Sequence, residues 1–119
     1  MNLLIVGSRN IEKFDLSEHI SPQIDLIISG GAKGVDNFAE KYADEHKISK
    51  LIMRPRYDLY GKAAPLKRNE KMVDIADEIL IVWDGISKGT KYTLEYAKKK
   101  NKAVKVILYL QEDKKTDRF

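Results

Sequence analysis

Short apolar runs alternate with amphipathic segments along most of the chain. Runs such as LIIS at residues 26–29 are rich in isoleucine and leucine, which is typical of strands that are buried on both faces of a sheet. Turn-forming residues separate these runs from the segments that follow them. The pattern predicts five strands, over residues 2–6, 26–29, 50–53, 78–83 and 103–110.

The amphipathic segments predict helices because their apolar residues recur at intervals of three and four. The clearest helix is predicted over residues 35–47, with further helices over residues 66–76 and after residue 90 to about residue 100. A weaker helix is predicted over residues 11–20. It should end before Pro22, since proline disfavours helical backbone in the residue that precedes it.

Two stretches lack a regular pattern. Residues 54–65 contain two prolines and a glycine and predict a long irregular loop, and loops of this kind inside compact domains are usually functional. Residues 111–119 are polar and predict a loose tail. The chain therefore divides into one domain, residues 1–110, and a polar C-terminal tail, residues 111–119.

Strands that alternate with helices predict right-handed crossovers and a parallel sheet covered by helices on both faces. At 119 residues the chain is long enough for one such α/β domain. In doubly wound sheets ligands bind beyond the carboxyl ends of the strands, where the strand order reverses. Glycine-containing segments follow three of the predicted strands, at residues 7–9, 30–34 and 84–90. We therefore expect a binding site at this edge of the sheet.

The most distinctive of these segments is GGAKG at residues 30–34, which joins a buried strand to a helix. The first turn of a helix has unpaired N–H groups and a partial positive charge, so such a junction can hold an anion. Glycines let a phosphate approach the backbone, and Lys33 adds a cation. The spacing fits neither of the common phosphate-binding glycine motifs. A tight strand-to-helix connection therefore explains this segment, taken alone, nearly as well.

Composition narrows the class of protein. Hydrophobic residues make up 43% and charged residues 34% of the chain, as in ordinary globular proteins. There are no cysteines, which excludes disulfides, thiolate chemistry and cysteine zinc sites and favours a reducing, cytoplasmic compartment. The first apolar run is too short for a signal peptide or a membrane span.

The net charge of +4 raises the question of nucleic-acid binding. Several of the cations fall at a predicted helix end, where positive charge is favourable, or in the polar tail. The excess of positive charge is therefore attributed to solvated surface side chains. Around the strand exits cations outnumber acids, which suits a phosphorylated small molecule. The cations there are Arg9, Lys33, Lys62, Lys67, Arg68, Lys88 and Lys91, and the acids are Asp36, Asp58 and Asp84.

Polar and aromatic side chains near the exits have two interpretations. Ser8, Ser29, Ser87 and Thr90 could donate to phosphate or ribose oxygens, or they could serve as caps and turn formers without any ligand. The rings of Tyr57, Tyr60 and Trp83 could stack on a base or cap the core. The two histidines, His19 and His46, lie apart in the sequence, so no metal site and no cofactor are predicted.

Four sequence segments resemble the SLOG superfamily, which includes the Smf/DprA proteins and the Lonely Guy nucleotide hydrolases. They are GSR at residues 7–9, SGGAKGVDNFAEKYA at 29–43, YGKAAPLKRNEKM at 60–72 and VWDGISKGTKYTLEYA at 82–97. Order and spacing are most similar to the YspA-type branch. The resemblance implies a Rossmann-like, doubly wound parallel sheet of five strands in the order 3-2-1-4-5, within a three-layer αβα architecture.

The resemblance also implies a nucleotide-derived ligand over residues 7–9, 30–34 and 89–90, with Arg68 and Asn69 reaching in. No catalytic residue is assigned. The predicted ligand-binding residues are Gly7, Ser8, Arg9, Ser29, Gly30, Gly31, Lys33, Gly34, Asp36, Arg68, Asn69, Asp84, Ser87, Gly89 and Thr90.

One departure from the Lonely Guy pattern bears on catalysis. Those hydrolases carry P-G-G-x-G-T-x-x-E, and the glutamate serves cleavage of the bond between ribose and base. Here Gly89 and Thr90 match the G-T, but Thr93 stands at the position of the glutamate, and Glu95 lies two residues further on. Two residues correspond to roughly 200° around a helix, so Glu95 should point away from the cleft.

The sequence therefore predicts a small cytoplasmic module that binds a nucleotide-like small molecule and acts as a sensor. The alternatives are a nucleotide N-glycoside hydrolase of the Lonely Guy type and, with less support, a DprA-like nucleic-acid binder. A membrane partner is not expected, nucleic acid is disfavoured, and a homodimer is left open.

Overall fold

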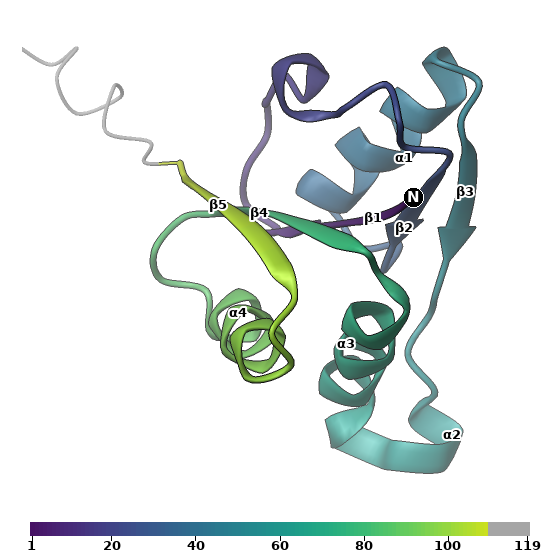
Figure 1. Cartoon of the computed structure of the whole chain (residues 1–119). Helices are drawn as coiled ribbons and strands as arrows, with labels where there is room; N and C mark the ends of the chain where they lie inside the picture. Colours follow the sequence, from purple (N-terminus) through teal and green to yellow (C-terminus); the bar gives the residue numbers. More distant parts are fainter. Residues whose placement is uncertain (110–119) are drawn as a thin grey trace, which may run out of the picture.

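The computed structural model describes residues 1–109 (Figure 1). The final position of the predicted fifth strand, residue 110, and the predicted tail, residues 111–119, lie outside the described residues. No helix within the described range is long and apolar enough to cross a membrane.

Within residues 1–109 the structure has five strands in one parallel sheet, in the order β3-β2-β1-β4-β5. This confirms the doubly wound α/β fold and its strand order. The strand order reverses between β1 and β4, because the chain moves outward through β2 and β3 before it returns to pair on the other side of β1. The strands are β1 (Asn2–Gly7), β2 (Leu26–Ser29), β3 (Ser49–Ile52), β4 (Glu78–Trp83) and β5 (Ala103–Leu108).

Helices cover both faces of the sheet and form the outer layers of a three-layer fold (Figure 1). Helix α1 (Val35–Glu45) packs on one face, where Leu3, Ile5 and Ile27 are buried. Helices α3 (Ala64–Ile75) and α4 (Lys88–Lys99) pack on the other face. Successive residues of β1 alternate between the two cores, and all four from Leu3 to Val6 are buried, which explains the unbroken apolar run.

The helix predicted over residues 11–20 is wrong. Only a short 3₁₀ turn, η1 (Ser17–His19), forms there. Ile11 and Leu16 are both buried in the core beneath this segment, yet residues five apart lie about 140° apart on a helix and cannot share its buried face. The Asp15 carboxylate also accepts hydrogen bonds from the N–H (2.9 Å) and hydroxyl (2.7 Å) of Ser17, which competes with helical backbone bonding.

The irregular loop predicted over residues 54–65 is wrong from residue 57 onward. Helix α2 (Tyr57–Tyr60) and a 3₁₀ turn, η2 (Gly61–Ala63), lead directly into α3. Pro65 lies in the first turn of α3, where its missing N–H would have no helical partner in any case. The remaining elements differ from prediction by a few residues at their ends. One shift matters for the site, because α4 begins at Lys88 and takes Gly89 and Thr90 into its first turn.

The residue before α1 fixes how the exits of β1 and β2 approach each other. Gly34 has a φ of +73° and precedes the first residue of the helix. A Cβ added there would lie 2.6 Å from the carbonyl oxygen of Ser8 and 2.8 Å from that of Arg9. Only glycine therefore lets the start of α1 rest against the backbone that leaves β1.

Replacing Gly34 with alanine should lower the free energy of unfolding more than replacing Gly61 with alanine. Both glycines have positive φ, 73° and 55°, and similar ψ, −126° and −132°. Backbone strain should therefore cost about 1–3 kcal/mol in each variant. At Gly34 the new Cβ also meets backbone atoms, whereas at Gly61 no described atom lies within 4 Å of it. We expect a further loss of about 1–3 kcal/mol at Gly34, measured by urea denaturation. Equal losses would contradict the close approach.

Candidate functional site

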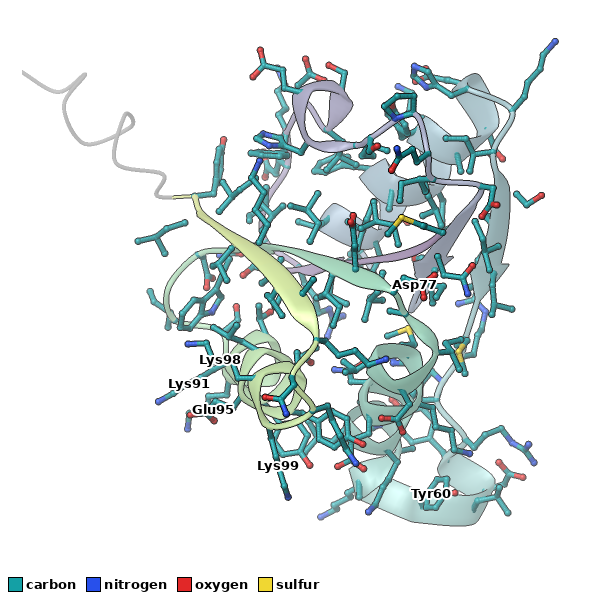
Figure 2. The ribbon with its side chains drawn as sticks, viewed as in Figure 1. Tyr60, Asp77, Lys91, Glu95, Lys98 and Lys99 are labelled. Carbon is teal, nitrogen blue, oxygen red and sulfur yellow. The ribbon has the colours of Figure 1, made fainter. Side chains whose placement is uncertain are left out.

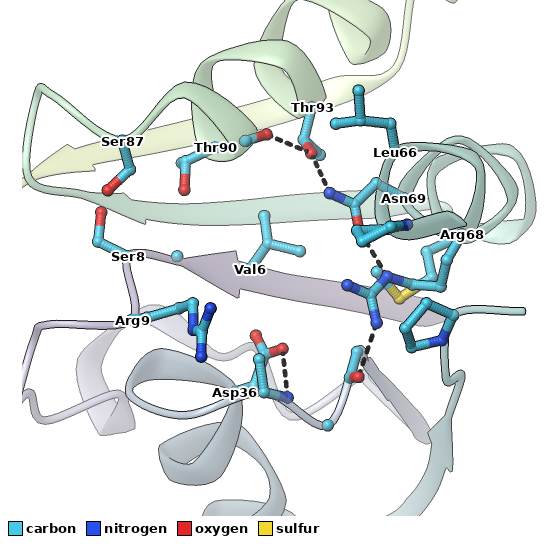
Figure 3. A pocket seen from close by; sticks show the side chains of 18 of the residues that line it. Val6, Ser8, Arg9, Asp36, Leu66, Arg68, Asn69, Ser87, Thr90 and Thr93 are labelled. Carbon is cyan, nitrogen blue, oxygen red and sulfur yellow. Dashed lines mark hydrogen bonds between the residues drawn. The ribbon is translucent and has the colours of Figure 1, made fainter. Parts of the chain in front are cut away.

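A cavity of about 680 Å³ opens at the carboxyl ends of β1, β2 and β4 (Figure 3). Its walls come from the segments that leave these three strands, from the segment between β3 and α3, and from α3 itself. The volume lies within the range of about 300–1,000 Å³ that is usual for ligand pockets. The cavity therefore lies at the strand-order reversal, as the sequence predicts.

Most of the predicted ligand-binding residues line this cavity. They are Gly7, Ser8, Arg9, Gly30, Gly31, Asp36, Arg68, Asn69, Asp84, Ser87, Gly89 and Thr90. Ser29, Lys33 and Gly34 are not among its lining residues. Ser29 is buried and donates to Glu40 Oε2 (2.9 Å), Lys33 is exposed, and Gly34 packs against the β1 exit.

The glycine-rich turn uses part of its own donor capacity. The N–H of Gly31 donates to Ser29 Oγ (3.1 Å), and the N–H of Ala32 donates to Asp36 Oδ2 (3.1 Å). Short polar side chains next to a turn compete for its amides in this way. Two of the donors expected to cradle an anion are therefore already paired within the protein.

Asp36 brings a buried carboxyl group to the cavity wall. Its side chain belongs to the first turn of α1, and the residue is 6% exposed. Burial raises the pKa of Asp36 to about 6, although the Ala32 N–H and the charge of Arg68 act in the opposite direction. The negative charge of Glu40 adds to the increase. A carboxyl group that titrates near neutral pH thus faces the ligand space.

A chain of hydrogen bonds crosses one wall of the cavity from β2 to α4 (Figure 3). Arg68 Nη1 donates to the carbonyl of Gly30 (2.8 Å), and Arg68 Nε donates to Asn69 Oδ1 (2.6 Å). Asn69 Nδ2 donates to Thr93 Oγ1 (2.9 Å), which donates to the carbonyl of Gly89 (3.0 Å). These bonds fix the segment after β2 and the start of α4 relative to α3. A large part of the hydrogen-bonding capacity of Arg68 and Asn69 is therefore used within the protein.

Asp84 organises the turn between β4 and α4. Its carboxylate accepts hydrogen bonds from the N–H groups of Ile86 (2.9 Å) and Ser87 (2.8 Å) and from the Ser87 hydroxyl (3.0 Å). Partial burial alone would raise the pKa of Asp84, but the hydrogen bonds from Ser87 and Ile86 lower it to about 2. The Asp84 N–H donates to Ser8 Oγ (3.0 Å), which ties the exits of β1 and β4 together.

The first turn of α4 faces the cavity with free polar groups. Thr90 is only 7% exposed, and its hydroxyl points into the cavity (Figure 3) without a hydrogen-bond partner in the described part of the chain. The Gly89 backbone is bare, since no described atom lies within 4 Å of a Cβ built there. The guanidinium of Arg9 also points into the cavity and has no partner among residues 1–109.

Several lining residues escaped the sequence analysis. Arg54 and Pro55 follow β3, so the rule that ligands meet strand ends would have found them. Others share the face of α3 that carries Arg68 and Asn69. Which residues share that face can be worked out from the helical period only when the first residue of the helix is known. The unpredicted lining residues are Val6, Asn10, Ala32, Arg54, Pro55, Pro65, Leu66, Met72 and Thr93.

The aromatic candidates divide between the two interpretations. Tyr57 lines the cavity and is 61% exposed, so its ring remains available for stacking. Trp83 packs against the core, and its Nε1 donates to the carbonyl of Ser87 (3.1 Å). Tyr60 does not line the cavity, and the ammonium of Lys71 lies 5.4 Å from the centre of its ring.

The expected orientation of Glu95 is confirmed. Glu95 is exposed on the outer side of α4, as are Lys91 and Lys98 (Figure 2), and it does not line the cavity. Thr93 is 1% exposed and does line it. Among residues 1–109, no group of three or more histidine, cysteine, aspartate or glutamate side chains is arranged to hold a metal ion.

Replacing Asp36 with asparagine should change how stability depends on pH. The pKa of Asp36 is about 6 in the folded protein against 3.8 ordinarily, so the folded state holds this proton more tightly than the unfolded chain. Stability from Asp36 is therefore greatest below pH 3.8 and is lost as the pH rises through 6. Relative to the parent, the free energy of unfolding of Asp36→Asn should rise by about 2–3 kcal/mol between pH 4 and pH 7.

Urea denaturation at a series of pH values would measure this difference. Glu45→Gln is the matched control, because it neutralises an exposed carboxylate on the same helix. Its curve should stay parallel to that of the parent. A parallel curve for Asp36→Asn would contradict the elevated pKa.

No family model matches the chain, and no solved structure matches it. The chain is similar to the "Gene 61 protein" of Mycobacterium phage D29, with 28% identity over 87 residues. The aligned part covers 68% of this chain and 70% of the phage protein. The name of the phage protein states no ligand and no activity. The function proposed for the chain therefore rests on its own residues.

Proposed function

We propose that the protein is a small cytoplasmic module that binds a nucleotide-derived or other phosphorylated ligand at the carboxyl edge of the sheet and acts as a sensor. We further propose that it belongs to the YspA-type branch of the SLOG superfamily. The observation that carries the proposal is the convergence of three glycine-containing strand exits on one cavity, beside an unpaired arginine and the first turn of α4. The motif resemblance supports the same ligand class.

The phosphate belongs at the α4 end of the cavity. The first turn of a helix offers unpaired N–H groups and partial positive charge. The unpartnered hydroxyl of Thr90 lies in this turn, and the free guanidinium of Arg9 reaches into the same cavity from the β1 exit. The glycine-rich turn is the poorer anion site, because two of its amides are paired and the Asp36 carboxyl group lies beside it. An arginine fork and helix amides together are a common phosphate-binding arrangement.

Apolar side chains supply a surface for the remainder of the ligand. The α2–α3 side of the cavity presents the Tyr57 ring and the side chains of Pro65, Leu66 and Met72. Ligand sites typically combine such an apolar lining with a few placed polar groups. A base attached to a sugar phosphate would satisfy both parts of this cavity.

Replacing Arg9 with alanine should weaken binding of nucleoside 5′-monophosphates by about 10- to 100-fold, the value of a charge-assisted hydrogen bond. Isothermal titration calorimetry with the four ribonucleoside 5′-monophosphates and their parent nucleosides would measure it. In Arg9→Ala the advantage of nucleotide over nucleoside should largely disappear, because the lost contact is to the phosphate. Lys88→Ala is the control, since Lys88 is an exposed cation in the first turn of α4 and does not line the cavity. Equal nucleotide affinity in Arg9→Ala and the parent would refute this assignment.

The parent protein should not convert nucleoside 5′-monophosphates to free base and ribose phosphate. General acid–base assistance is worth about 10²–10⁴ in rate, but only from a group within hydrogen-bond reach of the reacting atoms. Thr93 lines the cavity and, by the motif resemblance, corresponds to the glutamate of the Lonely Guy pattern, whereas Glu95 is exposed. Chromatography of long incubations at high protein concentration would measure base release.

Thr93→Glu is the single substitution best placed to introduce trace hydrolysis, and Glu95→Gln is its matched control. The sensor assignment fails if the parent releases base and that release is lost in Glu95→Gln. Base release by the parent that persists in Glu95→Gln would also overturn it, and would point to a different acid–base group in the cavity.

A further inference from the structure

The cavity contains one carboxyl group that the fold leaves largely unused. Of the described residues that line it, Asp36 and Asp84 carry carboxyl groups. The Asp84 carboxylate already accepts three hydrogen bonds from its own turn. The Asp36 carboxylate accepts one from the Ala32 N–H and a weaker one from the Gly30 N–H, although an ionised carboxylate offers about four acceptor positions. Asp36 therefore retains acceptor capacity on its cavity side.

Leaving a buried carboxyl group underused is costly for a protein. Buried polar groups are nearly always hydrogen-bonded, and a buried charge is normally paired. Asp36 is 6% exposed, and none of the ion pairs formed by residues 1–109 includes it. Arg68, whose positive charge acts on Asp36, directs Nη1 at the carbonyls of Gly30 (2.8 Å) and Met53 (3.1 Å). These observations favour a donor supplied by the ligand.

The surroundings narrow the chemistry of that donor. Arg68 contributes positive charge beside Asp36, and Arg9 reaches into the cavity from the β1 exit (Figure 3), so a cationic ligand group would meet repulsion. An anionic group would be repelled by the carboxylate itself. A neutral donor remains, and a pair of hydroxyl groups suits the two oxygens of a carboxylate.

The positions of Thr90 and Asp36 on two sides of the cavity indicate which part of the ligand carries this donor. Figure 3 shows Thr90 on the α4 side and Asp36 on the α1 side, with Val6 of β1 between them. A ligand whose phosphate sits at the first turn of α4 therefore crosses the end of β1 toward Asp36. In a nucleoside 5′-monophosphate the next hydroxyl groups along the molecule are those of the ribose.

We propose that Asp36 determines ligand specificity by accepting hydrogen bonds from the ribose hydroxyl pair, so that the cavity selects ribonucleotides over 2′-deoxyribonucleotides. This inference rests on the proposed binding of a nucleotide. It assigns Asp36 a binding role, separate from the phosphate contacts of Arg9 and Thr90.

The test compares the four ribonucleoside 5′-monophosphates with their four 2′-deoxy counterparts by isothermal titration calorimetry. The parent should bind at least one ribonucleotide about 10- to 100-fold more tightly than its 2′-deoxy form, since a hydrogen bond to a charged group is lost. In Asp36→Ala this ratio should fall toward one, and in Asp36→Asn it should be intermediate, because the amide keeps one acceptor. Asn37→Ala is the control, since Asn37 is the exposed neighbour on α1 and does not line the cavity.

The outcomes separate this inference from the proposed function. If the parent binds both series equally, the role of Asp36 is refuted while nucleotide binding stands. A ratio that persists in Asp36→Ala also refutes it and places the discrimination elsewhere. If neither series binds the parent, the proposed function fails and takes this inference with it. Should Asp36→Ala fail to fold, the nearly isosteric Asp36→Asn decides, because an unchanged ratio there would overturn the proposal.

Discussion

At the carboxyl end of β1, backbone segments from three parts of the chain approach so closely that glycine is needed at two of the contacts. A Cβ at Gly7 would lie 2.3 Å from the carbonyl oxygen of Val82 in β4 and 2.5 Å from Val35 Cγ2 at the start of α1. Gly34 meets the carbonyl of Ser8 in the same way, and the Ser8 N–H donates to Val82 (3.0 Å). This packing holds the exits of β1, β2 and β4 together. The shared cavity exists because the three exits cannot move apart independently.

Much of the sheet could be predicted from the sequence because burial on both faces leaves an unambiguous apolar run. The bounds of β2 and β4 agree with the prediction, and their parallel pairing with β1 follows from the intervening helices. The segment around Ile11 and Leu16 could not be predicted, because its apolar residues enter the core from an irregular backbone that has no period. Helix α2 was missed for a related reason, since a helix of four residues is too short to show a helical period in the sequence.

The candidate site could be predicted only in part from the sequence. The segments that leave the strands can be recognised in the sequence by their glycines and by their place after an apolar run. Most of the residues predicted from them therefore line the cavity. Helical period alone was enough to separate Thr93 from Glu95. The allocation of hydrogen bonds could not be predicted. The Ala32 amide donates to the Asp36 carboxylate because the packing of α1 on the sheet brings that side chain within 3.1 Å of it, which the sequence does not reveal.

The hydrogen bonds from Gly30 through Arg68, Asn69 and Thr93 to Gly89 make the two sides of the cavity unequal. Substituting Arg68 or Asn69 would remove hydrogen bonds that link α3 to the β2 exit and to α4, and would disturb the framework as well as the contact. Arg9 and Tyr57 are different, because both are exposed and none of the hydrogen bonds described for residues 1–109 involves either side chain. Their replacement leaves the framework intact. New ligand preferences can therefore arise by substitution at these two positions with little effect on stability, while the hydrogen-bonded wall preserves the shape of the cavity.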